Sequence, residues 1–319
     1  MNAPQPEEGE GIAIAGNLAR MGDIMPASKK KPGTRTSHQT TPVITLLSDF
    51  GHRDNYVGVM KGVILSICRE ARLVDLSHET APGDVSAGAF LLDASVDYFP
   101  DGTVHLAVVD PGVGGDRRPI AVQAGETFLV GPDNGVLSLA LGRLEEHVGR
   151  VRIVHLTSPH FQLPRTGRTF HGRDIFAPTA AHLASGVPID RLGERIEDPL
   201  RLSVPTCGET AGAIVGEVVY IDRFGNLVTN IPGKQVERLT GERAEAVVYL
   251  GRRRIGMVRE SYDSVDRGKP LGIVGGFGRL EISVRDGCAA RDLAGRIGLR
   301  VRLATRKKAA KPGKFRNNP

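Results

Sequence analysis

The chain shows two patterns of hydrophobic and polar positions, and the change between them comes near residue 205. Before that point, short apolar runs rich in β-branched residues alternate with stretches whose apolar residues recur at helical spacing. The expected strands are residues 42–47, 73–76, 104–109, 120–122 and 128–130, and the expected helices are residues 55–68, 85–99, 136–144 and 174–185. Strands that alternate with helices predict an α/β domain with a mainly parallel sheet between helices.

After residue 205, short β-type runs follow one another, separated by glycines and charged turns. The expected strands are residues 214–220, 246–250, 255–258, 271–274, 280–284 and 299–303. Only residues 289–297 have a helical pattern. This part of the chain predicts a second, smaller domain of antiparallel β structure, either a barrel or a sandwich.

The two ends of the chain lack periodicity. Residues 1–40 mix Pro, Gly, Ser, Lys and Glu, and residues 306–319 carry six basic residues and no acid. Such composition is typical of disordered segments. The expected organisation is therefore a disordered tail over 1–40, an α/β N-terminal domain over 41–205, a β-rich C-terminal domain over 206–305, and a basic disordered tail over 306–319.

Composition narrows the class of protein. The chain is 40% hydrophobic and 24% charged, as is usual for a globular protein. No stretch approaches the roughly 20 apolar residues of a membrane span, and the first residues lack the apolar core of a signal peptide. Three widely spaced cysteines suit reduced thiols. These features predict a cytoplasmic protein with no membrane partner.

The formal net charge of +6 comes from the two ends of the chain. Residues 306–319 alone contribute +6, residues 1–40 contribute +1, and the remainder is −1. A nearly neutral body is not typical of a nucleic-acid-binding protein. We therefore expect no specific nucleic-acid partner.

The strongest candidate for chemistry follows the expected strand over 104–109. The strand opens into Asp110 and a glycine-rich loop, with Arg117 seven residues further on, and His171 precedes another helix. Ligands of open α/β sheets bind at this edge. Together, the three side chains suggest water or proton chemistry. The alternative is that Asp110 and Arg117 form an ion pair that only holds the loop.

Acids also follow the first strand. Asp49 can accept hydrogen bonds from a ribose diol or cap the turn that follows. Asp54 and Tyr56 lie near the start of the next helix, within reach of the same edge.

The β-rich part contains one loop with unusual chemistry. Asp222 offers a carboxylate to an ammonium group, Phe224 a ring face to a base, and Asn226 an amide edge to adenine. A hairpin turn with a buried Phe explains the same residues. Residues 275–278 offer backbone N–H groups to a carboxylate, or form a bulged turn.

Several familiar motifs are missing from the sequence. There is no GxxxxGK[ST], no GxGxxG after the first strand, no HExxH or HxxxH, and no GxSxG. The sequence therefore favours neither phosphate-centred nucleotide binding, nor a metal site, nor a serine hydrolase.

Five segments, in order and at similar spacing, resemble one known family. They are SDFG at 48–51, VDPGVG at 109–114, GPDNG at 131–135, FHGRD at 170–174 and DRFGN at 222–226. The chain resembles, over about residues 42–304, the S-adenosyl-L-methionine (SAM) hydroxide adenosyltransferases. These are adenosine-forming SAM hydrolases related to fluorinase and chlorinase. The resemblance implies an α/β domain followed by a β-barrel-like domain.

The resemblance also implies an assembly and a set of site residues. Members form homotrimers with sites between the N-terminal domain of one subunit and the C-terminal domain of its neighbour, and whether trimers pair into hexamers stays open. The implied substrate-binding residues are Asp49 for the ribose diol, Asp54, Tyr56 and Asp222 for the methionine end, and Phe224 and Asn226 for adenine. The residues implied to handle the attacking water are Asp110, Arg117 and His171.

Those last three residues favour a hydrolase over a halogenase, because an Asp at the nucleophile site repels a halide. The expected reaction is hydrolysis of SAM to adenosine and L-methionine, with SAM as substrate and neither a cofactor nor a metal. The alternatives are a non-catalytic SAM or adenosine sensor and a halogenase that forms 5′-halo-adenosine. Gly83 stands where relatives carry an aromatic residue, and Gly276 where they often carry a polar one.

Overall fold

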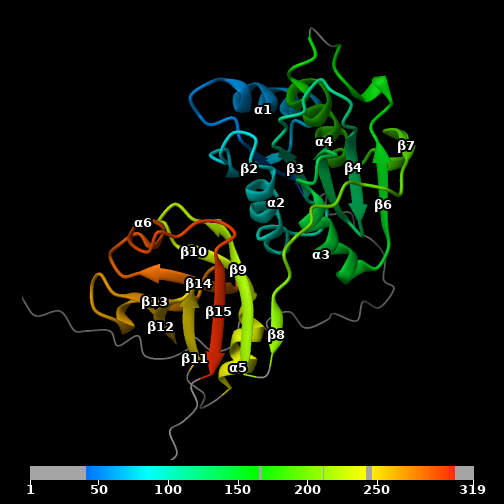
Figure 1. The fold of residues 1–319 in the computed structure, drawn as a ribbon. Helices are drawn as coiled ribbons and strands as arrows, with labels where there is room; N and C mark the ends of the chain where they lie inside the picture. Colours follow the sequence, from blue (N-terminus) through cyan, green and yellow to red (C-terminus); the bar gives the residue numbers. More distant parts are fainter. Residues whose placement is uncertain (1–40, 165–166, 211, 242–245, 306–319) are drawn as a thin grey trace, which may run out of the picture. The chain divides into compact units, whose positions relative to one another are not determined.

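The computed structural model describes residues 41–164, 167–210, 212–241 and 246–305. The tails expected over 1–40 and 306–319 lie outside the described residues. The described chain contains an α/β part followed by a β-rich part (Figure 1). Both fold classes expected from the hydrophobic pattern are confirmed.

The α/β part is built on a seven-stranded sheet of order β2-β1-β3-β5-β4-β6-β7. Its strands are β1 (Val43–Ser48), β2 (Arg72–Ser77), β3 (Val104–Val108), β4 (Pro119–Ala124), β5 (Thr127–Pro132), β6 (Val151–His155) and β7 (Glu194–Arg195). Strands β2, β1, β3 and β5 pair in parallel, and β4 is antiparallel to both β5 and β6. Since only β4 and β7 run against the other five, the sheet is mainly parallel.

The helices of this part are α1 (Tyr56–Ile67), α2 (Val85–Asp93), α3 (Ser138–Val148) and α4 (Ala177–Ala184). All four were expected, but the helix expected over 85–99 ends at Asp93, and a 3₁₀ turn, Val96–Tyr98, follows. Strands β6 and β7 were not predicted. The first places charged and apolar residues in alternation, and the second is two residues long, so neither has a clear apolar run.

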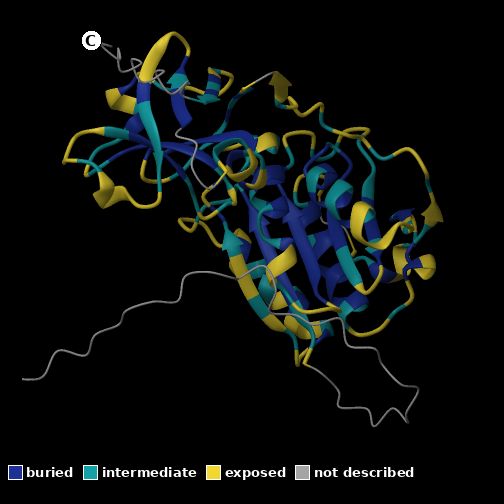
Figure 2. Cartoon of the chain, turned by 90° about the horizontal axis from the view of Figure 1, so that it is seen from below, coloured by how far each residue is buried: buried dark blue, intermediate teal, exposed yellow. Residues whose placement is uncertain are grey.

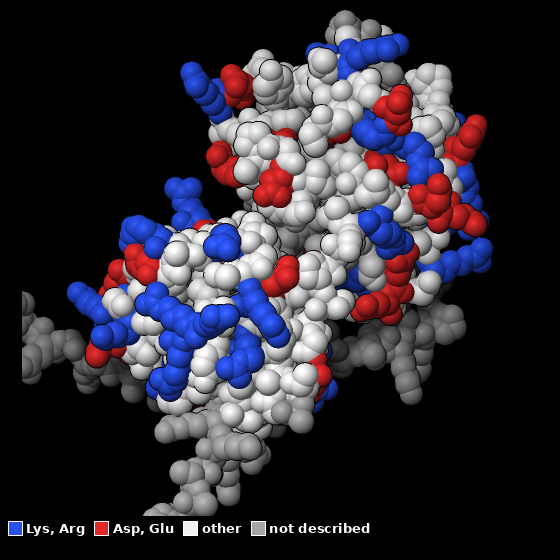
Figure 3. Space-filling view, in the orientation of Figure 1, with Lys and Arg blue, Asp and Glu red and all other residues white. Residues whose placement is uncertain are grey.

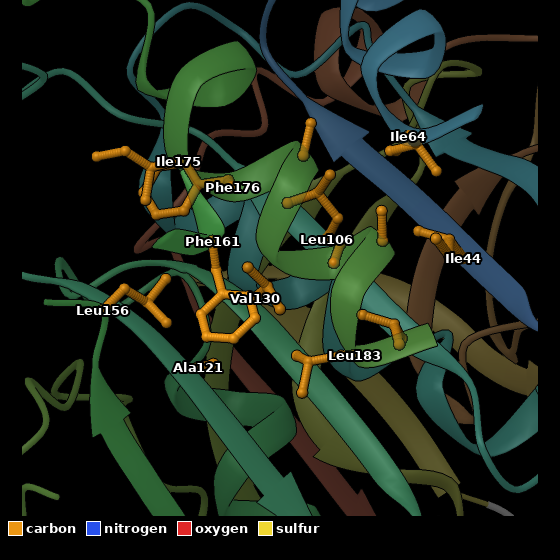
Figure 4. Packing of buried hydrophobic residues seen from close by; sticks show 14 of the residues in the cluster. Ile44, Ile64, Leu106, Ala121, Val130, Leu156, Phe161, Ile175, Phe176 and Leu183 are labelled. Atoms are coloured by element: carbon orange, nitrogen blue, oxygen red, sulfur yellow. The ribbon is translucent and has the colours of Figure 1, made fainter. Parts of the chain in front are cut away.

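Alternation along the strands divides the core into two layers. On one face, Ile44, Leu106 and Val130 pack against Ile64 of α1 and Leu183 of α4 (Figure 4). On the other face, a second buried cluster packs α2 and α3 on the sheet. Figure 2 shows the central strands buried, with exposed residues on the surrounding helices and loops. The strand ends are therefore held by a rigid, doubly covered sheet.

The β-rich part forms a closed barrel of seven strands. These are β9 (Ala213–Ile221), β10 (Leu227–Pro232), β11 (Ala246–Leu250), β12 (Arg253–Arg259), β13 (Pro270–Val274), β14 (Arg279–Val284) and β15 (Arg300–Thr305), while β8 (Gly208–Thr210) adds to β9 from outside the ring. Pairing of β10 with β9 closes the ring. Strands β12 and β13 pair in parallel, so the barrel is mixed, with antiparallel pairing elsewhere.

Two elements of the barrel were not expected from the sequence. Strand β10 lies in the segment interpreted as a loop, and helix α5 (Gly233–Thr240) follows it directly. Helix α6 (Ala289–Asp292) covers only the first half of the helix expected over 289–297. These differences arise because pairing with both β9 and β14 stabilises a strand whose own sequence is mixed.

Charge is unevenly distributed over the described chain. On the face shown in Figure 3, Lys and Arg gather over the barrel, while acidic and basic residues mix on the α/β part. Among the described residues, no helix is both long enough and apolar enough to span a bilayer.

Candidate active site

Two neighbouring strands deliver the first acids of the site to one edge of the sheet. Strands β1 and β3 run in parallel, with Ser48 opposite Val108. Asp49 and Asp110 therefore leave the sheet at adjacent carboxyl ends, where open α/β sheets bind ligands. The sequence predicted this placement.

Asp110, Arg117 and His171 form one buried cluster. Arg117 Nε lies 2.9 and 3.0 Å from the two carboxylate oxygens of Asp110, and Arg117 Nη2 also donates to Asp110 Oδ2. The same Nη2 lies 2.7 Å from His171 Nδ1. The Asp110 and Arg117 side chains are only 4% and 10% exposed. The three candidates, 61 positions apart at most in the chain, thus meet in one cluster.

The contact between Arg117 and His171 also determines which nitrogen of the imidazole carries the proton. A guanidinium can only donate hydrogen bonds, so Nδ1 of His171 must be the acceptor. In the neutral ring, the proton is then on Nε2. Such a ring can orient a water molecule by donation, whereas Asp110 is the group of the cluster that is suited to accept a proton.

Backbone geometry folds the glycine loop onto the segment that carries His171. Gly114 has φ +80°, and a Cβ added there would lie 2.7 Å from the carbonyl oxygen of Arg168. His171 directly precedes a π-helical turn, Gly172–Phe176, that continues into α4. Such turns are frequent at functional sites. Asp174, the first residue of the helix expected over 174–185, lies inside this turn.

Asp49 connects the end of the first strand to the loop that precedes α2. Its Oδ2 accepts a hydrogen bond of 2.8 Å from the backbone N–H of Gly83. Gly83 has φ +76°, and a Cβ added there would lie 3.6 Å from Cβ of Pro111. A side chain at position 83 would be strained, because glycine adopts a positive φ at little cost and other residues do not.

Asp54 and Tyr56 lie beside the same edge. The Tyr56 ring packs 5.7 Å from Phe50 and 5.2 Å from Phe170, the residue before His171. These ring contacts bring the start of α1 next to the Asp110 cluster. Asp54 is exposed just before this helix, so its carboxylate is accessible to a ligand.

The barrel presents the remaining candidates on the turn between β9 and β10. Asp222 Oδ1 accepts from the backbone N–H groups of Phe224 and Asn226, at 2.9 and 2.8 Å, and Oδ2 accepts from Asn226 Nδ2 at 2.8 Å. Phe224 is 74% exposed. The turn is therefore a hairpin, as in the alternative interpretation of the sequence, but the Phe224 ring is exposed rather than buried.

A buried acid that the sequence analysis missed lies near this turn. Glu281 of β14 is 3% exposed, and burial, together with the charge of Asp222, raises its pKa to about 7. A Cβ on Gly275 would lie 1.9 Å from a Glu281 carboxylate oxygen, so a side chain at position 275 would require the Glu281 carboxylate to move. Nothing lies within 4 Å of the Cβ position of Gly276, which leaves open space where relatives often place a polar side chain.

An open cavity of about 720 Å³ adjoins the Asp110 cluster. Arg117 and His171 line it, together with residues 115–119 and the segment that follows β6. The volume is many times that of one water molecule, about 30 Å³. Water can therefore come close to both side chains, although His171 Nε2 itself has almost no accessible surface. Among the described residues, no group of three or more His, Cys, Asp or Glu side chains is arranged to hold a metal ion.

Comparison with known proteins agrees with the two-part architecture. The sequence matches the SAM hydroxide adenosyltransferase N-terminal domain over residues 44–193 and the C-terminal domain of the same name over residues 216–302. The chain belongs to the SAM hydroxide adenosyltransferase family. The resemblance seen in the five sequence motifs is thereby confirmed.

Relatives within and around the family are similar over most of the chain. A protein of Salinispora arenicola named (R)-S-adenosyl-L-methionine hydrolase is 37% identical over 269 residues, covering 83% of this chain and 98% of the relative. A fluorinase of an Actinoplanes species is 29% identical over 224 residues, covering 62% and 74%. The crystal structure of an uncharacterised conserved protein of Thermotoga maritima superposes with a TM-score of 0.76 at 34% identity, covering 82% of this chain and 99% of that one.

Proposed function

We propose that this SAM hydroxide adenosyltransferase is an enzyme that hydrolyses SAM to adenosine and L-methionine. The observation that carries the proposal is the buried cluster of Asp110, Arg117 and His171 beside a water-accessible cavity. The relative named (R)-SAM hydrolase supports it, and the fluorinases are less similar. From that relative's name, we also propose that the substrate is the (R) diastereomer at sulfur.

In the proposed reaction, water attacks C5′ in line with the sulfonium. The new O–C5′ bond forms as the C5′–S bond breaks, and its electron pair neutralises the sulfur, so the leaving group needs no proton. His171 orients the water, the cation of Arg117 stabilises the developing hydroxide, and Asp110 accepts the proton. Precise placement of such groups accounts for a large part of enzymatic rate enhancement.

The proposed substrate contacts divide between the two parts of the chain. Asp49 holds the ribose diol, and Asp54, Tyr56 and Asp222 hold the methionine end. Phe224 and Asn226 contact adenine. The exposure of Phe224 supports a homotrimer in which this turn completes the site of a neighbouring subunit. We also propose the domain boundaries 41–205 and 206–305, a cytoplasmic location, and no cofactor.

The Asp110 carboxylate is the observation that argues against a halogenase. It is buried next to the proposed nucleophile position, and taking a halide from water to a place beside a carboxylate is unfavourable. The charged and polar cluster is also more than a SAM sensor needs, since binding alone requires no activation of water.

The test is incubation of the purified protein with SAM in H₂¹⁸O, with EDTA present and halide absent, followed by mass spectrometry of the nucleoside. We expect adenosine with one ¹⁸O at the 5′-oxygen, and faster consumption of (R)-SAM from an epimeric mixture. Intact SAM that is nevertheless bound would support the sensor. A 5′-halo-adenosine formed on adding chloride or fluoride would support the halogenase.

A further inference from the structure

Four polar residues behind the turn that carries Asp49 form a connected network. Ser48 Oγ lies 2.7 Å from His78 Nδ1, and His78 Nε2 lies 3.1 Å from Asp75 Oδ1. Lys61 Nζ donates to Asp75 Oδ2 at 2.6 Å. The network joins the ends of β1 and β2 to α1, at the edge where the site lies.

The residue types are those of a serine hydrolase triad, but the geometry excludes that function. Ser48 is 0% exposed, so a substrate cannot reach its hydroxyl. In hydrolytic triads the serine contacts Nε2 of the histidine and the acid contacts Nδ1, whereas here the two ring nitrogens are exchanged. The network must therefore have a structural role rather than a catalytic one.

The network stabilises the turn Ser48–Gly51. The Phe50 N–H lies 3.3 Å from Ser48 Oγ, and the Gly51 N–H donates to the carbonyl oxygen of His78 at 2.7 Å. Burial lowers the pKa of His78, which keeps the ring neutral. Ser48 Oγ–H then donates to Nδ1, while Nε2 lies close to Asp75 Oδ1 without the alignment of a hydrogen bond. His78 thus fixes the turn through both its side chain and its backbone.

Asp49 lies in the middle of this turn, between Ser48 and Phe50. We infer that His78 is a positioning residue that aims the Asp49 carboxylate at the ribose diol of SAM and adenosine. This inference rests on the proposed function and concerns the recognition of the 2′-hydroxyl. A carboxylate is directional as an acceptor only when its backbone is fixed, so loss of the network should weaken discrimination between ribose and 2′-deoxyribose.

Three variants separate the two sides of the ring. The amide of His78→Asn can reach the Nδ1 position, so this variant keeps the contact with Ser48. The amide of His78→Gln reaches the Nε2 position and keeps the contact with Asp75. His78→Leu loses both contacts. His105→Gln is the control, because His105 is equally buried and bonded to Thr45 at 2.9 Å but lies inside β3, away from the turn.

The measurement is Kd for adenosine and 2′-deoxyadenosine by calorimetry, with kcat and KM for SAM and with thermal melting to verify folding. In the natural chain we expect adenosine to bind on the order of 10–100-fold more tightly than its deoxy analogue. We expect this ratio to fall to about threefold or less in His78→Leu and His78→Gln, and to persist in His78→Asn and His105→Gln. In the variants that lose the ratio, KM for SAM should rise while kcat changes little.

Several other outcomes would overturn the inference. A folded His78→Leu that keeps the full ratio would show that the network supports only stability. A loss shared equally by His105→Gln would show a general response to buried-histidine replacement. A natural chain that hydrolyses SAM but does not discriminate at the 2′-position removes this inference alone, whereas one that neither turns over SAM nor binds adenosine removes the proposed function as well.

Discussion

Asp110 and Arg117 are buried, and with His171 they form a complete hydrogen-bonded cluster within the α/β part. On the barrel, Asp222 bonds to its own turn, while the Phe224 ring is presented to the outside. One chain thus preorganises the groups proposed for chemistry, but it leaves the Phe224 ring accessible to a ligand or a neighbouring subunit. The difference suggests that catalysis and substrate affinity can be changed separately.

The largest effect is expected at Asp110. Asp110→Asn keeps the size of the side chain but removes the charge that accepts a proton, so we expect kcat to fall about 10²–10⁴-fold with little change in Kd for SAM. Adenosine formation and calorimetry measure the two quantities. Asp101→Asn, at an exposed acid of the turn before β3, is the control and should retain activity.

The same variant tests the alternative that Asp110 and Arg117 only hold the loop. In that case Asp110→Asn should lower the melting temperature, because it leaves Arg117 without its buried partner, and turnover per folded molecule should be unchanged. That result would remove Asp110 from the mechanism.

The second effect is a change in the stability of the barrel with pH. The raised pKa of Glu281 means that the folded protein holds this proton more tightly than the unfolded chain does. Stability from this group is fully present below pH 4.5 and is lost as pH rises to about 7. At 1.36 kcal/mol for each pKa unit, the loss is about 3 kcal/mol.

Denaturant unfolding between pH 4 and 8 measures this loss. Glu281→Gln should flatten the decline, while Glu237→Gln on the exposed face of α5 should leave it in place. Parallel curves for the natural chain and Glu281→Gln would mean that the group titrates normally.

The smallest of the three effects is expected at Asp222. A charged hydrogen bond to the substrate ammonium is worth about 1.5–3 kcal/mol, so Asp222→Ala should raise KM for SAM roughly 10–100-fold with kcat nearly retained. Asp222→Asn separates charge from turn geometry, since its side-chain oxygen can still accept from the Phe224 and Asn226 N–H groups. An effect on kcat alone would contradict the division between the two parts of the site.

The sequence by itself determined the two fold classes, the mainly parallel sheet and the placement of Asp49 and Asp110 at one sheet edge. These follow from the period of apolar residues and from the rule that parallel strands end together. The family was also recognisable, because its motifs are local and ordered. Strand β10 was not, since its mixed sequence becomes a strand only through the pairing that closes the barrel.

Only the tertiary structure decided which side chains meet across long separations. It placed His171 against Arg117, 54 positions away, and connected Ser48, Asp75 and His78 behind the Asp49 turn. It also buried Glu281 beside the charge of Asp222. Hydrogen bonds and pKa shifts depend on distances of a few ångströms and on exclusion of water, and neither quantity is encoded by residue type or spacing alone.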